Sequence, residues 1–153
     1  MQAPTRAVKR LEEAGLRPTR FREQTLEALL ATDSALSHKD LVHRLPDLDR
    51  VTIFRCIKQL RKSSLLHEVR GADGVCRFVV NRTQGNACPG NHPHFFCLSC
   101  GALTCLEGLR LPHLDLPTGF EVRGKQFLVE GICPGCAPGR TAVAGTDQKE
   151  IPS

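Results

Sequence analysis

The eight cysteines of this 153-residue chain include two CxxC pairs whose spacing suits a metal site. The first pair is Cys97 and Cys100, and the second, after 32 intervening residues, is Cys133 and Cys136. Two residues between cysteines let both sulfurs turn toward one ion, and four thiolates complete the tetrahedral coordination of Zn(II). Matched pairs favour this interpretation over a thiol redox pair or unconnected cysteines. We therefore predict a closed, structural zinc site that stabilises the second half of the chain.

A second candidate metal site contains histidines just before the first cysteine pair. His92 and His94 are two residues apart, and such residues face the same side of an extended segment, so both imidazoles can reach one ion. Three further residues are candidates for the remaining ligands, and the sequence does not choose among them. They are His67, Cys88 and Cys105.

The remaining cysteines, Cys56 and Cys76, are predicted to be buried thiols without chemistry. Cys56 lies on the apolar stripe of an expected helix, and Cys76 shares a strand face with Phe78 and Val80. Free cysteines in such positions behave as small apolar residues.

The composition is that of a soluble globular protein, with 41 % hydrophobic and 24 % charged residues. No apolar run approaches the roughly 20 residues that span a bilayer, which excludes a membrane protein. The N-terminal segment has no export signal. We therefore expect a cytoplasmic protein whose cysteines bind metal and do not form disulfides.

The positive net charge of +5 comes from the first half of the chain. Residues 1–80 carry 15 Lys and Arg against 10 Asp and Glu, whereas residues 81–153 carry 6 of each kind. This asymmetry is typical of a module that binds a polyanion, joined to a neutral module.

Four helices are predicted in the first half by apolar residues at helical spacing and by capping and stop signals. They cover residues 5–14, 20–31, 37–45 and 51–63. Two strand-like runs, 65–69 and 75–80, follow and are joined by the turn-forming sequence Gly-Ala-Asp-Gly. Helices followed by a hairpin describe a winged helix-turn-helix, in which the last helix enters the major groove of DNA.

The second half is predicted to be a small α/β module. Strand-like runs at 94–98, 102–106 and 127–132 surround a weakly helical segment at 107–116. The chain is therefore expected to be of the α+β class, with four consecutive parts. These are a winged-helix domain (1–80), a polar hinge linker (81–91), the α/β domain (92–138) and a disordered tail (139–153).

Several motifs, taken in their order and spacing, resemble those of the ferric uptake regulator family. They are Gly15–Arg20, Val51–Arg55, His92–Gly101, Gly119-Phe120 and Gly131–Cys136. The resemblance covers residues 7–136. It implies a homodimeric transcriptional repressor that binds operator DNA and has no small-molecule substrate. In such a protein a C-terminal α/β dimerisation domain holds the cysteine zinc site, and a sensing metal at the hinge favours the DNA-competent dimer.

The resemblance also implies roles for the candidate ligands. His92 and His94 match the hinge-site histidines, and His67 matches a wing ligand of zinc-sensing members. Cys105 falls where iron and peroxide sensors have a carboxylate, and Ala35 falls where they have a histidine. Because sulfur ligands favour Zn(II) over Fe(II), we predict a zinc uptake regulator. An iron or peroxide sensor, with Fe(II) or Mn(II) at this site, is the alternative.

The same resemblance implies which residues meet DNA. Thr52, Phe54 and Arg55 match the start of the recognition helix, where a ring can contact a thymine methyl and Arg a guanine or phosphate. Other contacts are expected to the DNA backbone or the minor groove. These residues are Arg17, Thr19, Arg20, Arg50 and Lys58. For Arg50 and Lys58 the alternative is a solvated surface charge.

The alternative from another functional class is a zinc-dependent hydrolytic enzyme, which would use an open His-His-Cys site to activate water. Such an enzyme needs a general base, and the acidic residues available for that role are Glu107 and Glu130. Neither lies within the ligand motifs, so we expect a regulator and not an enzyme.

Overall fold

The computed structural model describes residues 4–81, 92–106, 108–109, 111, 115–122 and 125–138. Its N-terminal part contains four helices whose bounds agree with the predicted ones to within a residue. They are α1 (Arg6–Glu13), α2 (Arg20–Leu30), α3 (His38–Arg44) and α4 (Arg50–Lys62). Each helix begins after a capping residue whose side-chain oxygen accepts hydrogen bonds from backbone N–H groups of the first turn. The caps are Thr5, Thr19, Ser37 and Asp49.

The first sheet contains the predicted hairpin and one additional short strand. The hairpin strands are β2 (Leu66–Arg70) and β3 (Cys76–Val80), and β1 (Leu36–Ser37) pairs antiparallel with the free side of β3. We call β2, β3 and the turn between them the wing. The strand β1 was not predicted, because two residues are too few for a period-two pattern.

The apolar faces of the four helices and of the hairpin form one core. Its fully buried members are Leu11, Leu26, Leu41, Ile53 and Leu60. Cys56 is buried, as predicted. The prediction for Cys76 is wrong, since this thiol is only half-buried. Cys76 begins β3 opposite Arg70, at the end of the hairpin farthest from the core residue Val80.

The second sheet consists of the three predicted strands. These are β4 (His94–Cys97), β5 (Leu103–Cys105) and β6 (Leu128–Gly131), in the order β5-β4-β6. The strand β5 is antiparallel to β4, and β6 is parallel to it. The prediction of a helix at 107–116 is wrong for the described residues of that segment, because none of them is helical. The predicted linker and tail fall outside the described residues, apart from Asn81.

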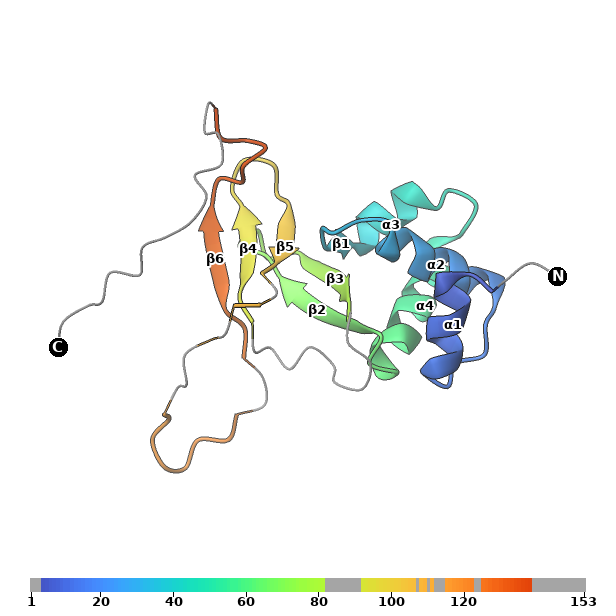
Figure 1. Ribbon diagram of the computed structural model, residues 1–153, viewed down its shortest axis with the longest axis horizontal. Coiled ribbons are helices and arrows are strands. Elements are labelled where there is room, and N and C mark those ends of the chain that lie inside the picture. Colours follow the sequence, from blue (N-terminus) through green and yellow to red (C-terminus); the bar gives the residue numbers. More distant parts are fainter. Residues whose placement is uncertain are drawn as a thin grey trace.

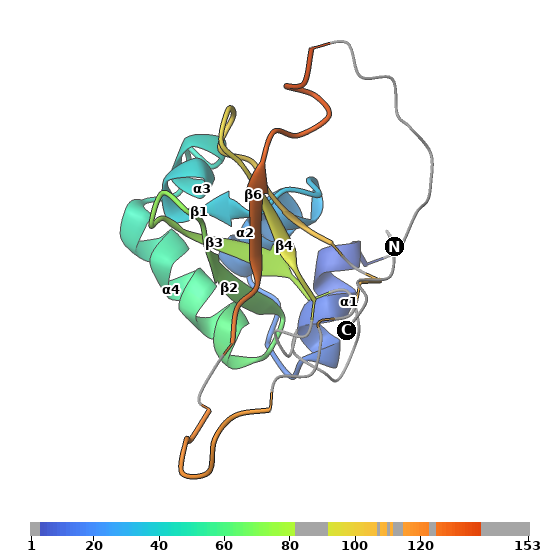
Figure 2. The same cartoon turned by 90° about the vertical axis from the view of Figure 1, so that its left-hand side faces the viewer.

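The wing lies between the helices and the second sheet (Figures 1 and 2). A small apolar cluster joins the two sheets and consists of Ala35, Val69, Phe96 and Leu103. The backbone N–H of Ala35 donates to the carbonyl of Leu103 at 2.8 Å. The two parts of the chain therefore share a packed interface among the residues that the structure describes.

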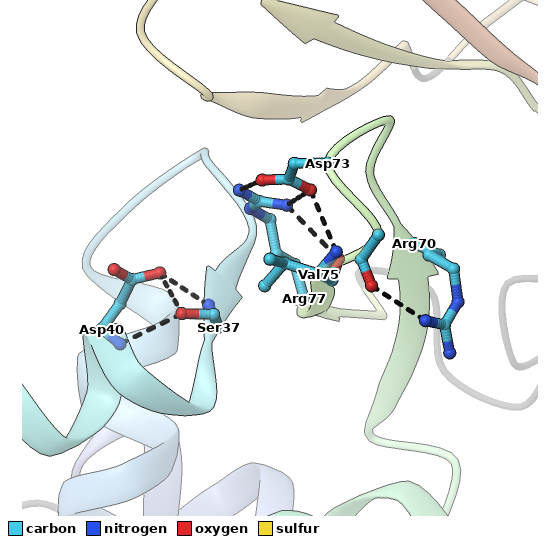
Figure 3. A network of polar contacts seen from close by, with 7 residues as sticks. Ser37, Asp40, Arg70, Asp73, Val75 and Arg77 are labelled. Carbon is cyan, nitrogen blue, oxygen red and sulfur yellow. Dashed lines mark hydrogen bonds and ion pairs between the residues drawn. The ribbon is translucent and has the colours of Figure 1, made fainter.

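Side-chain hydrogen bonds and a cation–π contact fasten the wing to the second sheet. Gln126 pairs with the backbone of Arg70, accepting from its N–H at 3.0 Å and donating to its carbonyl at 2.7 Å. At the wing tip the Arg77 guanidinium donates to both carboxylate oxygens of Asp73, at 2.9 and 2.7 Å (Figure 3). It also lies over the ring of Phe96 in β4, 5.3 Å from the centroid. The wing tip is thus held by a residue of the second sheet.

In the part of the chain that is described, no helix combines the length and the apolar character needed to cross a membrane.

Candidate metal centres and nucleic-acid interface

The four cysteines of the CxxC pairs lie together, as their spacing predicts, and form what we call the four-cysteine centre. Their sulfurs all lie within 4.8 Å of one another, and the Sγ atoms of Cys100 and Cys133 are 3.9 Å apart. Four sulfurs bound tetrahedrally to Zn(II) at about 2.3 Å would be roughly 3.8 Å apart. The parallel pairing of β4 with β6 sets Cys97 beside Gly131, which brings the second pair next to the first. The donor set and its spacing fit a zinc ion.

Backbone N–H groups favour the thiolate form in this centre. The N–H of Cys133 donates to Cys97 Sγ at 3.3 Å. The backbone N–H groups of Cys100 and Cys133 lower the pKa of Cys97 from 9.0 to about 6. Gly101 has φ +70°, a conformation that lets the chain turn back from the first pair into β5. The backbone therefore stabilises a thiolate at Cys97, where a cation would bind, whereas the neighbouring thiols help to raise the pKa of Cys136 to about 11.

Three imidazoles and one thiol form a second cluster, which we call the histidine centre. Their ligand atoms also lie within 4.8 Å of one another, and the residues are His67, His92, His94 and Cys105. The two Nε2 atoms of His67 and His94 are 3.4 Å apart, and Cys105 Sγ is 3.6 Å from His67 Nε2. Imidazole nitrogens about 2.0–2.1 Å from a tetrahedral Zn(II) would be separated by roughly 3.3 Å. Cys88, the other candidate ligand, lies outside the described residues.

The histidine centre takes its residues from both sheets. His67 comes from β2 of the wing, whereas His94 and Cys105 face each other across the antiparallel pair β4–β5. An ion bound by these side chains would therefore bridge the wing and the second sheet.

Burial keeps one imidazole of this centre neutral. His94 is 3 % exposed, and its Nδ1 atom has no hydrogen-bond partner among the described residues. Burial, followed by the charges of His92 and His67, lowers the pKa of His94 from 6.5 to about 4. A neutral imidazole is the form that binds metal.

Sequence reasoning missed one residue that contacts the histidine centre. Asn81, which is 4 % exposed, places its Oδ1 atom 2.5 Å from Nδ1 of His67. No sequence signal identifies it, because the contact joins residues 14 positions apart across the paired strands.

The exposed face of α4 carries several of the residues predicted to meet DNA. Phe54 is 58 % exposed, and Arg50, Arg55 and Lys58 are exposed as well. The ring of His38 packs edge-on against Phe54 at 6.2 Å and lies 3.0 Å from the carbonyl of Arg50. His38 thus packs against the exposed ring of Phe54 and contacts the first turn of the helix.

Two predicted DNA contacts already have a role within the protein. The hydroxyl of Thr19 caps α2, and that of Thr52 donates to Asp49 at 2.5 Å. Arg22 joins the loop before α2 to α4, because it donates to the carbonyl of Arg17 at 2.6 Å and to Gln59 Oε1 at 2.8 Å. Arg17 and Arg20 are exposed beside this junction. The loop and α4 therefore form one basic surface.

A winged helix-turn-helix with a basic helix face, joined to a small sheet that carries cysteine and histidine centres, defines a class of DNA-binding proteins that respond to metals. The sequence model of the Ferric uptake regulator family matches residues 13–110. The chain belongs to this family, and it is a metal-responsive, DNA-binding transcriptional regulator.

Curated relatives and solved structures agree with this assignment. The chain is 26 % identical over 140 residues to the ferric uptake regulation protein of Bacillus subtilis (strain 168), covering 86 % of this chain and 92 % of the relative. It is also 26 % identical over 142 residues to the peroxide operon regulator of the same organism, covering 86 % and 91 %. A solved zinc uptake regulator complexed with zinc and DNA has the same fold. Its TM-score is 0.61 at 20 % identity, over 85 % of this chain and 89 % of that one.

Proposed function

We propose that this regulator is a zinc-sensing repressor of zinc-uptake genes, with the histidine centre as its sensing site. The observation that carries the proposal is the ligand set of three imidazoles and one thiol. No carboxylate joins this cluster among the described residues. A nitrogen and sulfur donor set favours Zn(II) over Fe(II) and Mn(II), which bind better to sites rich in oxygen ligands.

The environment of Ala35 supports zinc over iron. This residue stands where the iron and peroxide sensors that the sequence resembles carry a histidine. Here its side chain is 6 % exposed and packs against Val69, Phe96 and Leu103. The position contributes to the apolar contact between the sheets and supplies no ligand atom.

We assign a structural zinc ion to the four-cysteine centre. Four thiolates leave no open position on the ion, so this centre would hold its metal permanently. A zinc ion there would stabilise the pairing of β4 with β6, because β6 contributes no fully buried side chain of its own.

In the proposed mechanism, zinc at the histidine centre ties the wing to the second sheet. His67 belongs to the wing of the DNA-binding half, whereas His94 and Cys105 belong to the second sheet. A bound ion therefore restricts how the two halves lie relative to each other. Such a ligand needs a coupling free energy of only about 1–3 kcal/mol to change DNA affinity roughly 5- to 150-fold.

A homodimer is part of this proposal, because two DNA-binding halves must be held at half-site spacing. Large apolar side chains are exposed on and around β6, and this strand lies at the edge of the second sheet. They are Phe127, Val129 and Ile132, while Leu116, Phe120 and Val122 are exposed in the segment that precedes β6 in the chain. Exposed apolar patches of this kind mark protein interfaces, and we infer that a second copy of the chain covers them.

The proposal is tested with a DNA duplex selected from a random pool by the zinc-loaded protein. Its affinity should rise on adding Zn(II) to protein that already holds the structural zinc, and Fe(II) and Mn(II) should act less strongly. His92→Ala should abolish the rise, whereas His43→Ala, at an exposed position in α3, should preserve it. Equal affinity with and without Zn(II) would refute zinc sensing, and a stronger response to Fe(II) would identify an iron or peroxide sensor.

A further inference from the structure

The structure assigns a positioning role to Asn81: it orients His67 in the histidine centre and connects that ligand to the end of the recognition helix α4. This inference rests on the proposed function of His67 as a ligand of the sensing metal. Asn81 follows β3 directly and is 4 % exposed, so its polar contacts are sheltered from water.

The side-chain amide of Asn81 contacts two different elements. Its Nδ2 atom donates to the carbonyl of Ser64 at 2.6 Å, and its Oδ1 atom lies 2.5 Å from Nδ1 of His67. A carbonyl only accepts hydrogen bonds, so the amide nitrogen must face Ser64 and the amide oxygen must face His67.

This orientation determines which nitrogen of His67 carries the proton. The Oδ1 atom of Asn81 only accepts, so Nδ1 of His67 must donate to it. In a neutral imidazole the lone pair then lies on Nε2. It is Nε2 that is 3.4 Å from His94 Nε2 and 3.6 Å from Cys105 Sγ. Asn81 thus presents the metal-binding nitrogen of His67 to the centre, in the way that outer partners orient metal ligands.

The other contact of the amide reaches the end of α4. This helix ends at Lys62, Ser63 is its C-cap, and Ser64 has φ +59°. Backbone hydrogen bonds link this turn to the helix, with Ser64 donating to Arg61 at 3.0 Å and Leu65 to Leu60 at 3.0 Å. Asn81 therefore holds the turn at which the recognition helix ends.

The backbone of Asn81 extends the connection to a second helix. Its N–H donates to the carbonyl of Leu65 at 2.9 Å, and its carbonyl accepts from the guanidinium of Arg10 in α1. A shift of His67 on metal binding would therefore change the contacts that Asn81 makes with α1 and with the end of α4. The helices would also influence the geometry of the metal site, since coupling between two sites is reciprocal.

Two substitutions separate the two contacts of the side chain. Asn81→Leu removes both hydrogen bonds and keeps the branched shape of the side chain. Asn81→Asp keeps an acceptor toward His67 but removes the donor toward Ser64. Each variant is compared with the wild-type protein in two measurements. The first is the zinc affinity of the histidine centre, by chelator competition with the four-cysteine centre loaded. The second is the ratio of duplex affinities with and without saturating Zn(II).

We expect Asn81→Leu to weaken zinc binding at the histidine centre by about 10- to 100-fold and to reduce the affinity ratio. Asn81→Asp should bind zinc at least as tightly as the wild-type protein and still show a reduced ratio. Wild-type values of both quantities in Asn81→Leu would overturn the inference. A wild-type ratio in Asn81→Asp would overturn the connection to α4.

A measurement on the unaltered protein tests the orientation directly, whether or not the variants fold. Long-range proton–nitrogen NMR of the zinc-loaded protein should find the proton of His67 on Nδ1, and a proton on Nε2 would overturn the inference. If the proposed function is wrong, the wild-type protein itself will show no change in DNA affinity on adding zinc. A normal wild-type response that Asn81→Leu leaves unchanged would defeat only the role of Asn81.

Discussion

Adding one methyl group at Gly71 should weaken the contact between the wing and the second sheet. Gly71 is buried at the start of the wing turn. A Cβ atom there would lie 2.6 Å from Arg77 Nη1, 2.7 Å from Asp73 Oδ1 and 2.9 Å from Phe96 Cε2. All three distances are shorter than van der Waals contact. Either the Arg77 and Asp73 pair must separate, or the wing must move away from Phe96.

The magnitude follows from the contacts that would be lost. Inserting a methyl group into a packed site costs about 1–3 kcal/mol, and a partly buried guanidinium over an aromatic ring contributes about 0.5–2 kcal/mol. We therefore expect Gly71→Ala to lower the free energy of unfolding by about 2–4 kcal/mol. Gly74→Ala is the matched control, because Gly74 lies in the same turn with φ +75° and nothing within 4 Å of a Cβ. Its expected cost is about 1–2 kcal/mol, from backbone strain alone.

A double-mutant cycle with Phe96→Leu distinguishes contact across the interface from local strain. Urea unfolding is measured for each glycine variant with and without the Phe96 substitution. The cost of Gly71→Ala should shrink when the ring is absent, whereas the cost of Gly74→Ala should add to that of Phe96→Leu within about 0.5 kcal/mol. Additive costs for Gly71 and Phe96 would refute the packing of the wing tip on β4.

Two other predictions concern the metal centres. Cys97→Ser should release the structural zinc and unfold the second sheet. The measurements are the zinc content per chain and the strand signal in circular dichroism, both of which should fall. A variant that stays folded without zinc would refute the structural role. For protein with an empty histidine centre, the pKa of His94 near 4 lies below the 6.5 of the unfolded chain. The unfolded state then binds the extra proton, so the free energy of unfolding should fall by roughly 1–3 kcal/mol as the pH drops from 7 to about 4.5. His94→Gln should lose less stability over this range, and an equal loss in both proteins would contradict the depressed pKa.

The features that were predicted correctly from the sequence depend on residues that lie close together in the chain. Ser37 and Asp40 form the expected capping box, with both reciprocal hydrogen bonds present. Each CxxC pair lies in a local turn that places its two sulfurs on the same side. Apolar residues at helical spacing placed α4, including the buried Cys56. In each case the physical cause lies within a few residues, so the spacing alone contains the information.

The features that escaped prediction depend on how distant segments pack. The choice of His67 and Cys105 as neighbours of His94 depends on the β4–β5 register and on the docking of the wing. Asn81 contacts His67 and Ser64 only because the hairpin folds back on the end of α4. Cys76 follows the pattern of a core residue but is the first residue of β3, next to the turn of the hairpin. None of these relations has a signature in the spacing of residues.

Anomalous scattering at the zinc edge, from crystals of the zinc-loaded protein, tests the assignment of the sensing site most directly. We predict two zinc ions per chain. One should lie among the four cysteine sulfurs, and the other should be bound by His67 through Nε2 together with His92, His94 and Cys105. A single zinc ion per chain, or a second ion bound away from these four residues, would contradict zinc sensing at the histidine centre.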